Sequence, residues 1–166
     1  MISTATVQFY DVVVFFHILG VVIGFGPTFA YALFAGMAAR EGVHASLAVE
    51  RAILRWNETG NTAGMIVILL SGIYLAADRW QFGDVFVSWG FVVIIALFGL
   101  VHGYFLPRER KLIAGLEAEA DAAGPGGSRE RPPELAAIDR EVARVGMVAG
   151  IVIVVTIYLM TAKPFL

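Results

Sequence analysis

The sequence predicts an all-α integral membrane protein, a four-helix bundle with a cytoplasmic extension of helices three and four. Four stretches contain no Asp, Glu, Lys or Arg: 12–39, 59–77, 85–107 and 145–162. An α-helix needs roughly 20 mainly apolar residues to cross a bilayer, and the absence of period-two alternation excludes a membrane β-barrel. The mean hydropathy of +0.77 is also too high for an ordinary soluble domain. We therefore expect residues 1–166 to form a single transmembrane domain.

The first span is expected at about residues 9–38, and it carries a helix-breaking signal in its middle. Gly24, Gly26 and Pro27 lie close together there, and a proline inside a helix removes one backbone hydrogen bond and bends the chain. Such a bend is either a packing kink or a functional break that lines a cavity. The sequence leaves both readings open.

The remaining spans are expected at about residues 59–78, 85–106 and 142–162. Residues 45–58 have the apolar spacing of a helix, and nothing breaks this pattern before Gly60, which allows the approach and the second span to form one long helix. Residues 122–133 are rich in Gly and Pro and predict a flexible hinge between spans three and four. Apolar residues at helical spacing on both sides of the hinge predict a helical hairpin.

The distribution of cations predicts the orientation of the spans. Ten of the twelve Lys and Arg residues lie in the connections 40–58 and 108–144, and only Arg79 and Lys163 lie on the opposite side. By the positive-inside rule, the long connections are then cytoplasmic and both termini lie outside. We expect a multi-pass protein of the cell (inner) membrane.

Each span contains two glycines spaced four residues apart, a pattern that lets helix backbones approach closely in lipid. The pairs are Gly20 and Gly24, Gly60 and Gly64, Gly99 and Gly103, and Gly146 and Gly150. They predict tight helix–helix seams, either within one protomer or between protomers of a homo-oligomer.

Polar side chains inside the spans form two layers when depth is counted at about 1.5 Å per residue. His17 belongs to the outer layer and His102 to the inner layer, and the two histidines are about 12 Å apart along the membrane normal. The outer layer also contains Ser71, Tyr74 and Thr156. The inner layer also contains Thr28, Asn57, Glu58, Asn61, Thr62 and Arg144. Two histidines this far apart are not the axial ligands of a single haem.

Ionisable groups inside a membrane are costly, so each histidine is a candidate site residue. His17 is either hydrogen-bonded to a neighbouring helix, with Thr156 and Tyr74 as partners at its level, or it is a ligand of haem or of a metal ion, because neutral imidazole is the commonest metal donor. For His102, close to the interface, a hydrogen bond is the simpler interpretation. Residues 57–62 form either a capped helix start or a polar mouth that faces the rest of the inner layer.

The first span, His17-Ile-Leu-Gly-Val-Val-Ile-Gly24, resembles the opening of a family of small bacterial four-span proteins catalogued as predicted integral membrane proteins of unknown function. The later elements of that family are matched here by Leu70-Ser71-Gly72-Ile73-Tyr74 and by Leu106-Pro107-Arg108. The resemblance covers nearly the whole chain, and it implies a four-span membrane fold.

That family is in turn similar to the CopD-type copper-resistance proteins and the HemJ-type protoporphyrinogen oxidases. The HemJ-type resemblance implies that His17 is a haem ligand, with haem b as the candidate cofactor. The essential lysine of those enzymes has no counterpart, because residues 85–107 contain no Lys. The CopD-type resemblance implies copper handling, although the methionines of the spans are scattered and form no Met-rich motif.

Three classes of function are compatible with these residues. The first is a non-enzymatic oligomeric bundle that depends on its glycine seams, the second a haem- or metal-binding redox protein with His17 as ligand, and the third a small transporter or ion channel that uses the Pro27 kink and the polar layers. No Ser/His/Asp pattern, paired carboxylates at depth or phosphate loop is present, so we expect no catalytic residues and favour the first class. The expected partners are the lipid bilayer and further copies of the chain, and a net charge of −2 offers no basic field for nucleic acid.

Overall fold

The computed structural model describes residues 6–123 and 132–164, and every regular element in these two ranges is a helix. Most of the expected hinge at 122–133 lies outside the described residues. The elements are α1 (Phe9–Phe25), η1 (Gly26–Ala30), α2 (Tyr31–Glu41), α3 (Val43–Trp56), η2 (Asn57–Asn61), α4 (Thr62–Arg79), α5 (Val85–Leu100), η3 (Val101–Phe105), α6 (Leu106–Ala123) and α7 (Pro133–Ala162).

These elements join end to end into four long helices, each long and apolar enough to cross a membrane. The helices are Phe9–Glu41, Val43–Arg79, Val85–Ala122 and Pro133–Ala162. With 30 to 38 residues, they measure about 45 to 57 Å, which exceeds the hydrocarbon core of about 30 Å. The expected all-α membrane bundle is confirmed, and all four helices, rather than the last two alone, extend beyond a membrane's thickness.

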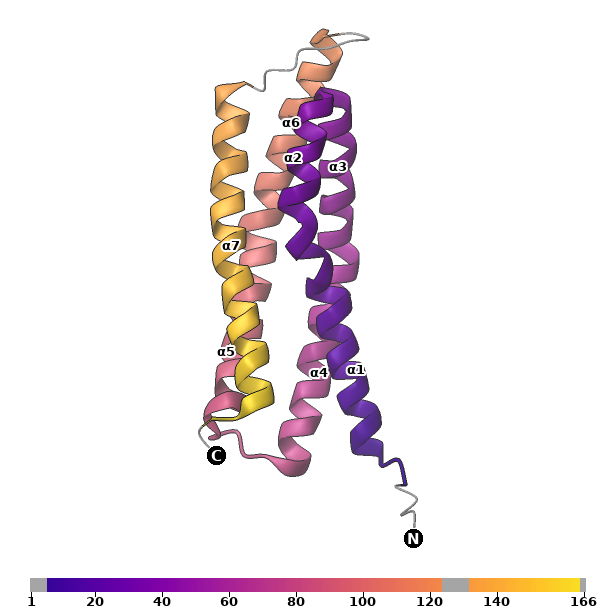
Figure 1. Cartoon of the computed structure of the whole chain (residues 1–166), viewed down its shortest axis with the longest axis vertical. Helices are drawn as coiled ribbons and strands as arrows, with labels where there is room; N and C mark the ends of the chain where they lie inside the picture. Colours follow the sequence, from indigo (N-terminus) through magenta and orange to yellow (C-terminus); the bar gives the residue numbers. More distant parts are fainter. Residues whose placement is uncertain (1–5, 124–131, 165–166) are drawn as a thin grey trace.

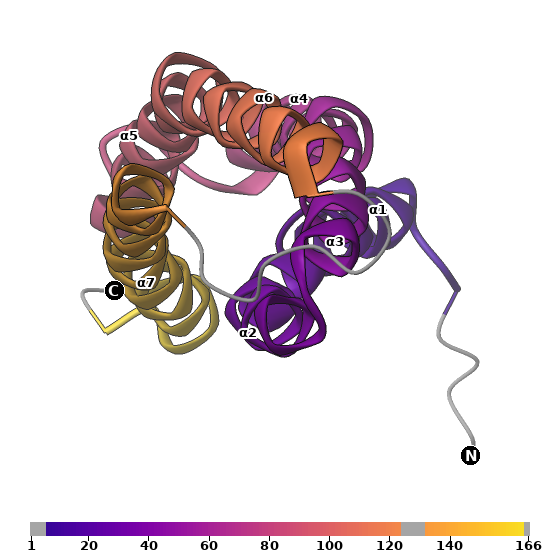
Figure 2. The same cartoon turned by 90° about the horizontal axis from the view of Figure 1, so that it is seen from above.

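Two halves follow one another along the long axis of the bundle (Figure 1). The terminal half contains α1, α4, α5 and the C-terminal part of α7, and both chain ends lie at its end of the bundle (Figure 1). The connection half contains α2, α3, α6 and the N-terminal part of α7. Seen from above, the helices are arranged as a ring (Figure 2), in which α1 packs on α4, α3 on α6, and α5 on α7.

A single residue joins the first two long helices. Gly42 adopts φ +114° between α2 and α3, a backbone conformation that glycine reaches without a steric penalty. Its N–H donates to the carbonyl of Ala38 at 3.2 Å, which closes the end of α2. The charged connection between the first two spans is therefore a tight helical hairpin at Gly42. After it, α3, η2 and α4 continue as one long helix, as the sequence allowed.

The helices differ in how much of their surface is buried. In the connection half, Leu112 and Leu116 of α6 are 2% and 1% exposed, and in the centre of the bundle Met65 of α4 is fully buried. α7 buries only Leu135 and Ile153. Its exposed apolar side chains are Met147, Val148, Ile151, Val154, Val155, Ile157 and Tyr158. An apolar outer face of this kind is what contact with lipid requires.

A glycine seam brings the backbones of α1 and α4 into close contact. A Cβ atom on Gly64 would lie 2.6 Å from the Cα of Gly24, and one on Gly20 would lie 3.2 Å from the carbonyl oxygen of Gly64. Bare backbone is therefore required at Gly64, where α1 and α4 touch. Gly60 is close instead to the Trp56 ring of its own long helix.

The other predicted glycine positions lie in more open surroundings. A Cβ atom on Gly99, Gly103 or Gly146 would meet no described atom within 4 Å, and one on Gly150 would meet Phe29 at 3.5 Å. Within one protomer, the close seam is thus formed by Gly20 and Gly24 of α1 and by Gly64 of α4. A role for Gly99, Gly103 and Gly146 in contacts between protomers stays a prediction.

Candidate functional site

An apolar cavity of about 520 Å³ lies in the terminal half between α1, α4, α5 and α7. Its walls are mainly aliphatic and aromatic side chains, such as Val21, Phe25, Leu69, Val87, Ile94 and Ile153. Polar groups are few, and they include His17, Tyr10, Thr156 and Lys163. Pockets for small molecules and cofactors commonly measure about 300 to 1,000 Å³ and combine apolar walls with a few polar groups. The cavity matches this pattern.

His17 is held at the wall of this cavity by Ser71. The Nδ1 atom of His17 lies 2.8 Å from the Oγ atom of Ser71 across the α1–α4 contact. The Ser71 hydroxyl donates its hydrogen to the carbonyl groups of its own helix, at Val67 and Ile68. Its oxygen is therefore the acceptor for His17, which assigns the proton of the neutral ring to Nδ1. The Nε2 lone pair is left for another partner.

The outer polar layer is only partly brought together. Thr156 lines the same cavity as His17, but its oxygen accepts a bond from the Trp89 indole at 3.0 Å, and its hydroxyl donates to the Val152 carbonyl at 2.8 Å. Tyr74 does not line the cavity, and its ring packs edge-on against Phe9. Ser71 takes the place of both expected partners, because the glycine seam fixes the rotation of α4 so that Ser71 faces α1.

The donor set at this cavity suits a single-ligand cofactor better than a bare metal ion. Among the described residues, no group of three or more His, Cys, Asp or Glu side chains could hold a metal. His17 offers one imidazole nitrogen, and its other nitrogen has a hydrogen-bond partner of the kind that fixes ligating histidines. Met160 also lines the cavity and adds a thioether. His17 is the residue of this cavity that could hold a cofactor through a ring nitrogen, and Met160 could contribute a second contact.

The inner polar layer is centred on Asn57, the first residue of η2. Its Oδ1 atom accepts bonds from the Tyr31 hydroxyl at 3.0 Å and from Asn61 Nδ2 at 3.2 Å, and its Nδ2 donates to Glu109 Oε1 at 2.7 Å. Asn57 and Glu109 are each 4% exposed, and Asn61 is 2% exposed. The network joins α2, η2 and α6, and it is almost completely enclosed.

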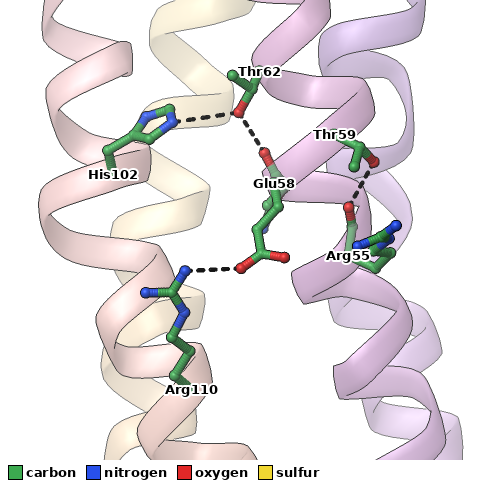
Figure 3. Close-up of polar contacts among 7 residues, drawn as sticks. Arg55, Glu58, Thr59, Thr62, His102 and Arg110 are labelled. Carbon is green, nitrogen blue, oxygen red and sulfur yellow. Dashed lines mark hydrogen bonds and ion pairs between the residues drawn. The ribbon is translucent and has the colours of Figure 1, made fainter.

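A second set of contacts surrounds this network (Figure 3). Figure 3 shows Arg110 of α6 reaching Glu58 and His102 of η3 pointing toward Thr62. The Arg110 guanidinium donates to Glu58 at 2.8 Å, and Thr62 Oγ1 lies 3.4 Å from His102 Nε2. The Nδ1 atom of His102 is 3.0 Å from the Phe98 carbonyl. These contacts link η2 and α4 to η3 and α6 at two positions, eight residues apart on the third long helix.

Two expected members of the inner layer lie apart from the network. The Thr28 hydroxyl donates to the carbonyl of Phe25 at 2.6 Å, within the same turn of helix. Arg144 is exposed on α7, and no hydrogen bond or ion pair between described residues joins it to the layer. Of the two readings of residues 57–62, the capped helix start does not apply, because η2 continues directly from α3.

Glu109 was not singled out from the sequence, although a signal was present. It follows the third charge-free stretch by two residues, and it occupies the helical stripe of α6 that also contains Leu112 and Leu116. Glu50 lies similarly on the buried stripe of α3 and is 5% exposed. A carboxylate at an apolar position of a helical repeat is therefore the pattern that identifies both residues.

The environment of Glu109 favours its neutral form. Burial raises the pKa of Glu109 to about 7, the nearby carboxyls of Glu50 and Glu58 add to this rise, and the hydrogen bond from Asn57 opposes it. Two buried oxygen atoms have no hydrogen-bond partner among the described residues, namely Glu109 Oε2 and Asn61 Oδ1. The indole Nε1 of Trp56 is a buried donor in the same situation.

Three of the four long helices leave α geometry at the level of this network. η1 is a 3₁₀ segment with Pro27 in its first turn, and η2 and η3 are π segments. The Tyr31–Asn57 bond connects the end of η1 to η2, and the Thr62–His102 contact connects the end of η2 to η3. π segments inside α-helices occur frequently at functional sites. The departure from α-helical geometry that was predicted at Pro27 is thus one of three that lie next to one another, in η1, η2 and η3.

A comparison with known families identifies the group of proteins to which these features belong. The family model described as "Predicted integral membrane protein (DUF2269)" matches residues 11–164. The chain belongs to this family. Membership confirms the resemblance found in the sequence and a lipid bilayer as the environment of the DUF2269 chain, but it does not extend to the CopD-type or HemJ-type proteins. No curated protein and no solved structure matches the chain.

Proposed function

We propose that this integral membrane protein binds a flat, largely apolar cofactor in the cavity of its terminal half, with His17 as the ligand and haem b as the candidate. The observation that carries the proposal is the contact of His17 with Ser71 at the cavity wall. Its Nδ1 is held by Ser71 at 2.8 Å, and Ser71 is itself tied to the carbonyl of Val67. The remaining nitrogen, Nε2, has the lone pair that a haem iron accepts from a proximal histidine.

The residues around His17 would have different roles in binding the cofactor. Apolar side chains of α1, α4, α5 and α7 would exclude water and cover the faces of the cofactor, and Ser71 would keep the imidazole from turning. Met160 of α7 lines the same cavity and would place its thioether against the cofactor. Bound haem would supply one-electron redox chemistry, which the protein side chains lack. No catalytic residue is part of the proposal.

Purified wild type, His17→Ala and His102→Ala test this function through haem binding. Haemin titrated into wild type in detergent should give a Soret band at one equivalent, and His102→Ala should behave in the same way. His17→Ala should lose the band while keeping nearly the same melting temperature, because one interhelical hydrogen bond is worth only about 0.6 kcal/mol. Ser71→Ala should bind about 10- to 100-fold more weakly, as expected when the residue that orients a ligating histidine is removed.

The outcome that contradicts cofactor binding is equally clear. If wild type and His17→Ala give the same weak, non-saturating spectrum, His17 is not a ligand. The cavity is then a space for an apolar molecule such as a lipid chain, and the protein belongs to the non-enzymatic structural class.

We also propose that the connection half faces the cytoplasm and that both termini lie outside, in the cell (inner) membrane. The uneven distribution of cations supports this orientation. The two cations of the terminal half stack on aromatic rings, with Arg79 3.9 Å from the Tyr10 centroid and Lys163 4.0 Å from the Trp80 centroid. The chain contains no cysteine, so a cysteine at Thr161 should label from outside intact cells, and one at Glu119 should not. The reverse labelling would overturn this orientation.

A homo-oligomer is the third part of the proposal. Its support is the exposed apolar face of α7 together with Gly146, where an added Cβ would meet no neighbouring atom of the described residues within 4 Å. Gly146→Leu should lower the mass of the protein–detergent complex measured by light scattering and leave the melting temperature of the protomer unchanged. A wild type that is monomeric across a range of mild detergents would remove the proposal.

A further inference from the structure

We propose that Glu109 and its neighbours Asn57 and Asn61 form a proton-binding site inside the connection half. This site is separate from the cavity of the terminal half, because none of its three residues lines that cavity. The proton would be carried by the Oε2 atom of Glu109.

The carboxyl group is enclosed and asymmetrically bonded. Glu109 is 4% exposed, and its two oxygens differ: Oε1 accepts the Asn57 amide at 2.7 Å, whereas Oε2 is buried with no partner among the described residues. An ionised carboxylate is acceptor-only, and a buried acceptor without a donor loses its hydration without compensation. A proton on Oε2 removes both the charge and the unsatisfied acceptor.

The network around Glu109 contains more than one buried oxygen without a partner among the described residues. Tyr31 and Asn61 both donate to Asn57 Oδ1, and Asn57 donates to Oε1, so none of these bonds reaches Oε2. Asn61 Oδ1 is a second buried oxygen without a partner. The described network therefore has two unsatisfied oxygens on its carboxyl and amide groups, and a protonated Glu109 supplies a donor to this set. The Trp56 indole cannot neutralise the carboxylate, because it carries no charge.

The charged and titratable groups that face Glu109 also favour a bound proton. They are Tyr31 of α2, Glu50 of α3 and Glu58 of η2, with Arg110 next to Glu109 on α6. Arg110 bonds to Glu58 at 2.8 Å, which directs the nearby positive charge to another carboxylate. The negative charges of Glu50 and Glu58 both raise the pKa of Glu109. Proton uptake near neutral pH is consistent with burial and with these neighbours.

The position of the site couples it to the helix breaks. Asn57 begins η2, and its backbone carbonyl also accepts the Thr62 hydroxyl at 2.8 Å. Loss of the proton leaves a charge against the first residue of the π segment, whereas its uptake leaves a neutral hydrogen-bonded group. The charge of Glu109 therefore acts, through Asn57, on η2, the segment that joins α3 to α4 in the second long helix.

Infrared difference spectroscopy on the full chain in detergent tests the site directly. Between pH 5 and pH 9, wild type should lose one protonated-carboxyl band with a midpoint near 7, far above an ordinary glutamate. Glu109→Gln should lack this transition, and Glu117→Gln should retain it, because Glu117 is an exposed carboxylate of the same helix that pairs with Arg51. A wild type without the band, or an unchanged transition in Glu109→Gln, overturns the proposal.

Two further variants keep the test decisive if Glu109→Gln does not fold. Asn57→Ala removes the hydrogen bond that lowers the pKa of Glu109, so the midpoint should rise; Glu50→Gln removes a charge that raises it, so the midpoint should fall. Midpoints that do not move in either variant contradict the site. Repeating the wild-type titration in tenfold higher NaCl should also leave the midpoint within about 0.3 pH units, because the site is enclosed and screening acts mainly on exposed charges. A midpoint lowered by about one unit would show that a metal cation, and not a proton, is the ligand.

Discussion

The terminal half and the connection half fill the space between their helices in different ways. The terminal half encloses an apolar cavity of about 520 Å³, and His17 is one of its few polar wall residues. The connection half is packed around Leu112 and Leu116 and contains a closed network of Asn57, Asn61 and Glu109. The first half has room for a ligand beside few polar groups, whereas the second holds its polar groups in a closed network, and its own space of about 510 Å³ is a more open groove along α2 and α3, lined by residues such as Phe34, Val49 and Trp56. Binding and proton chemistry are therefore expected in different halves of one bundle.

The seam that holds the terminal half together offers the largest change. Gly64→Leu should disrupt the α1–α4 contact, because even its Cβ atom would lie 2.6 Å from the Cα of Gly24, where no flexible side chain can move aside. Overpacking usually costs about 1–3 kcal/mol, and more where backbone must shift. We expect loss of most folded protein, measured by thermal unfolding and gel filtration in detergent. Gly99→Leu, where an added Cβ meets open space, is the matched control.

The two glycine variants distinguish a rigid seam from an adaptable one. If the melting temperatures of Gly64→Leu and Gly99→Leu differ by less than about two degrees, α1 can move away from α4 without a loss of stability. The terminal half would then be less rigidly packed than its contacts indicate.

The connection half should show the larger dependence of stability on pH. The pKa of Glu109 is raised from 4.5 to about 7 in the folded protein, so between these values the folded state binds more protons than the unfolded state. Stability should then fall as pH rises from about 4.5 to 7 and level off above that range. Glu109→Gln should remove this slope and be more stable than wild type at pH 8. Melting curves at half-unit pH steps measure the effect.

A matched control keeps this prediction specific to the buried carboxyl. Glu117→Gln changes an exposed carboxylate that is 45% accessible, and it should preserve the wild-type slope. A slope of opposite sign in wild type would mean that Glu109 is stabilised as a carboxylate.

The smallest effect on stability is expected for a change at the cavity wall. Gly72 lines the cavity, and a Cβ atom there would make an ordinary 3.5 Å contact with the His17 ring. Gly72→Leu should fill part of the cavity and change stability by about 0.5 kcal/mol or less, since glycine inside a helix is itself unfavourable by a similar amount. Haemin binding should nevertheless be lost. Retained binding at wild-type affinity would place the ligand elsewhere.

The composition of each segment was enough to predict the membrane fold. It was not enough to predict which side chains form hydrogen bonds between the helices. Long charge-free stretches predicted four spans, because crossing lipid depends on the composition of each helix by itself. The partner of His17 depends on how α4 is rotated about its axis, which the contact at Gly64 decides. Ser71 and Tyr74 lie three residues apart, so a small rotation selects one or the other, and hydropathy does not contain that information.

The inner site was partly visible in the sequence and partly hidden. Asn57 and Asn61 were noticed because polar residues are rare in the spans, and His102 for the same reason. Glu109 lay just outside a charge-free stretch, where a charge normally faces water, and only its place on the buried stripe of α6 shows otherwise. The π segments had no local signal, since their geometry depends on contacts between helices.

The two π segments also set the relative phase of the elements that they join, α3 with α4 and α5 with α6. Each accommodates the equivalent of one extra residue in a helix, and one residue corresponds to a turn of about 100° around the helix axis. Without η2, the buried faces of α3 and α4 could not both point inward along one continuous helix. Deleting a single residue there would turn α3 against α4 by about 100°, while α7, which continues as one helix from Pro133 to Ala162 through both halves, would hold the other side of the bundle in register.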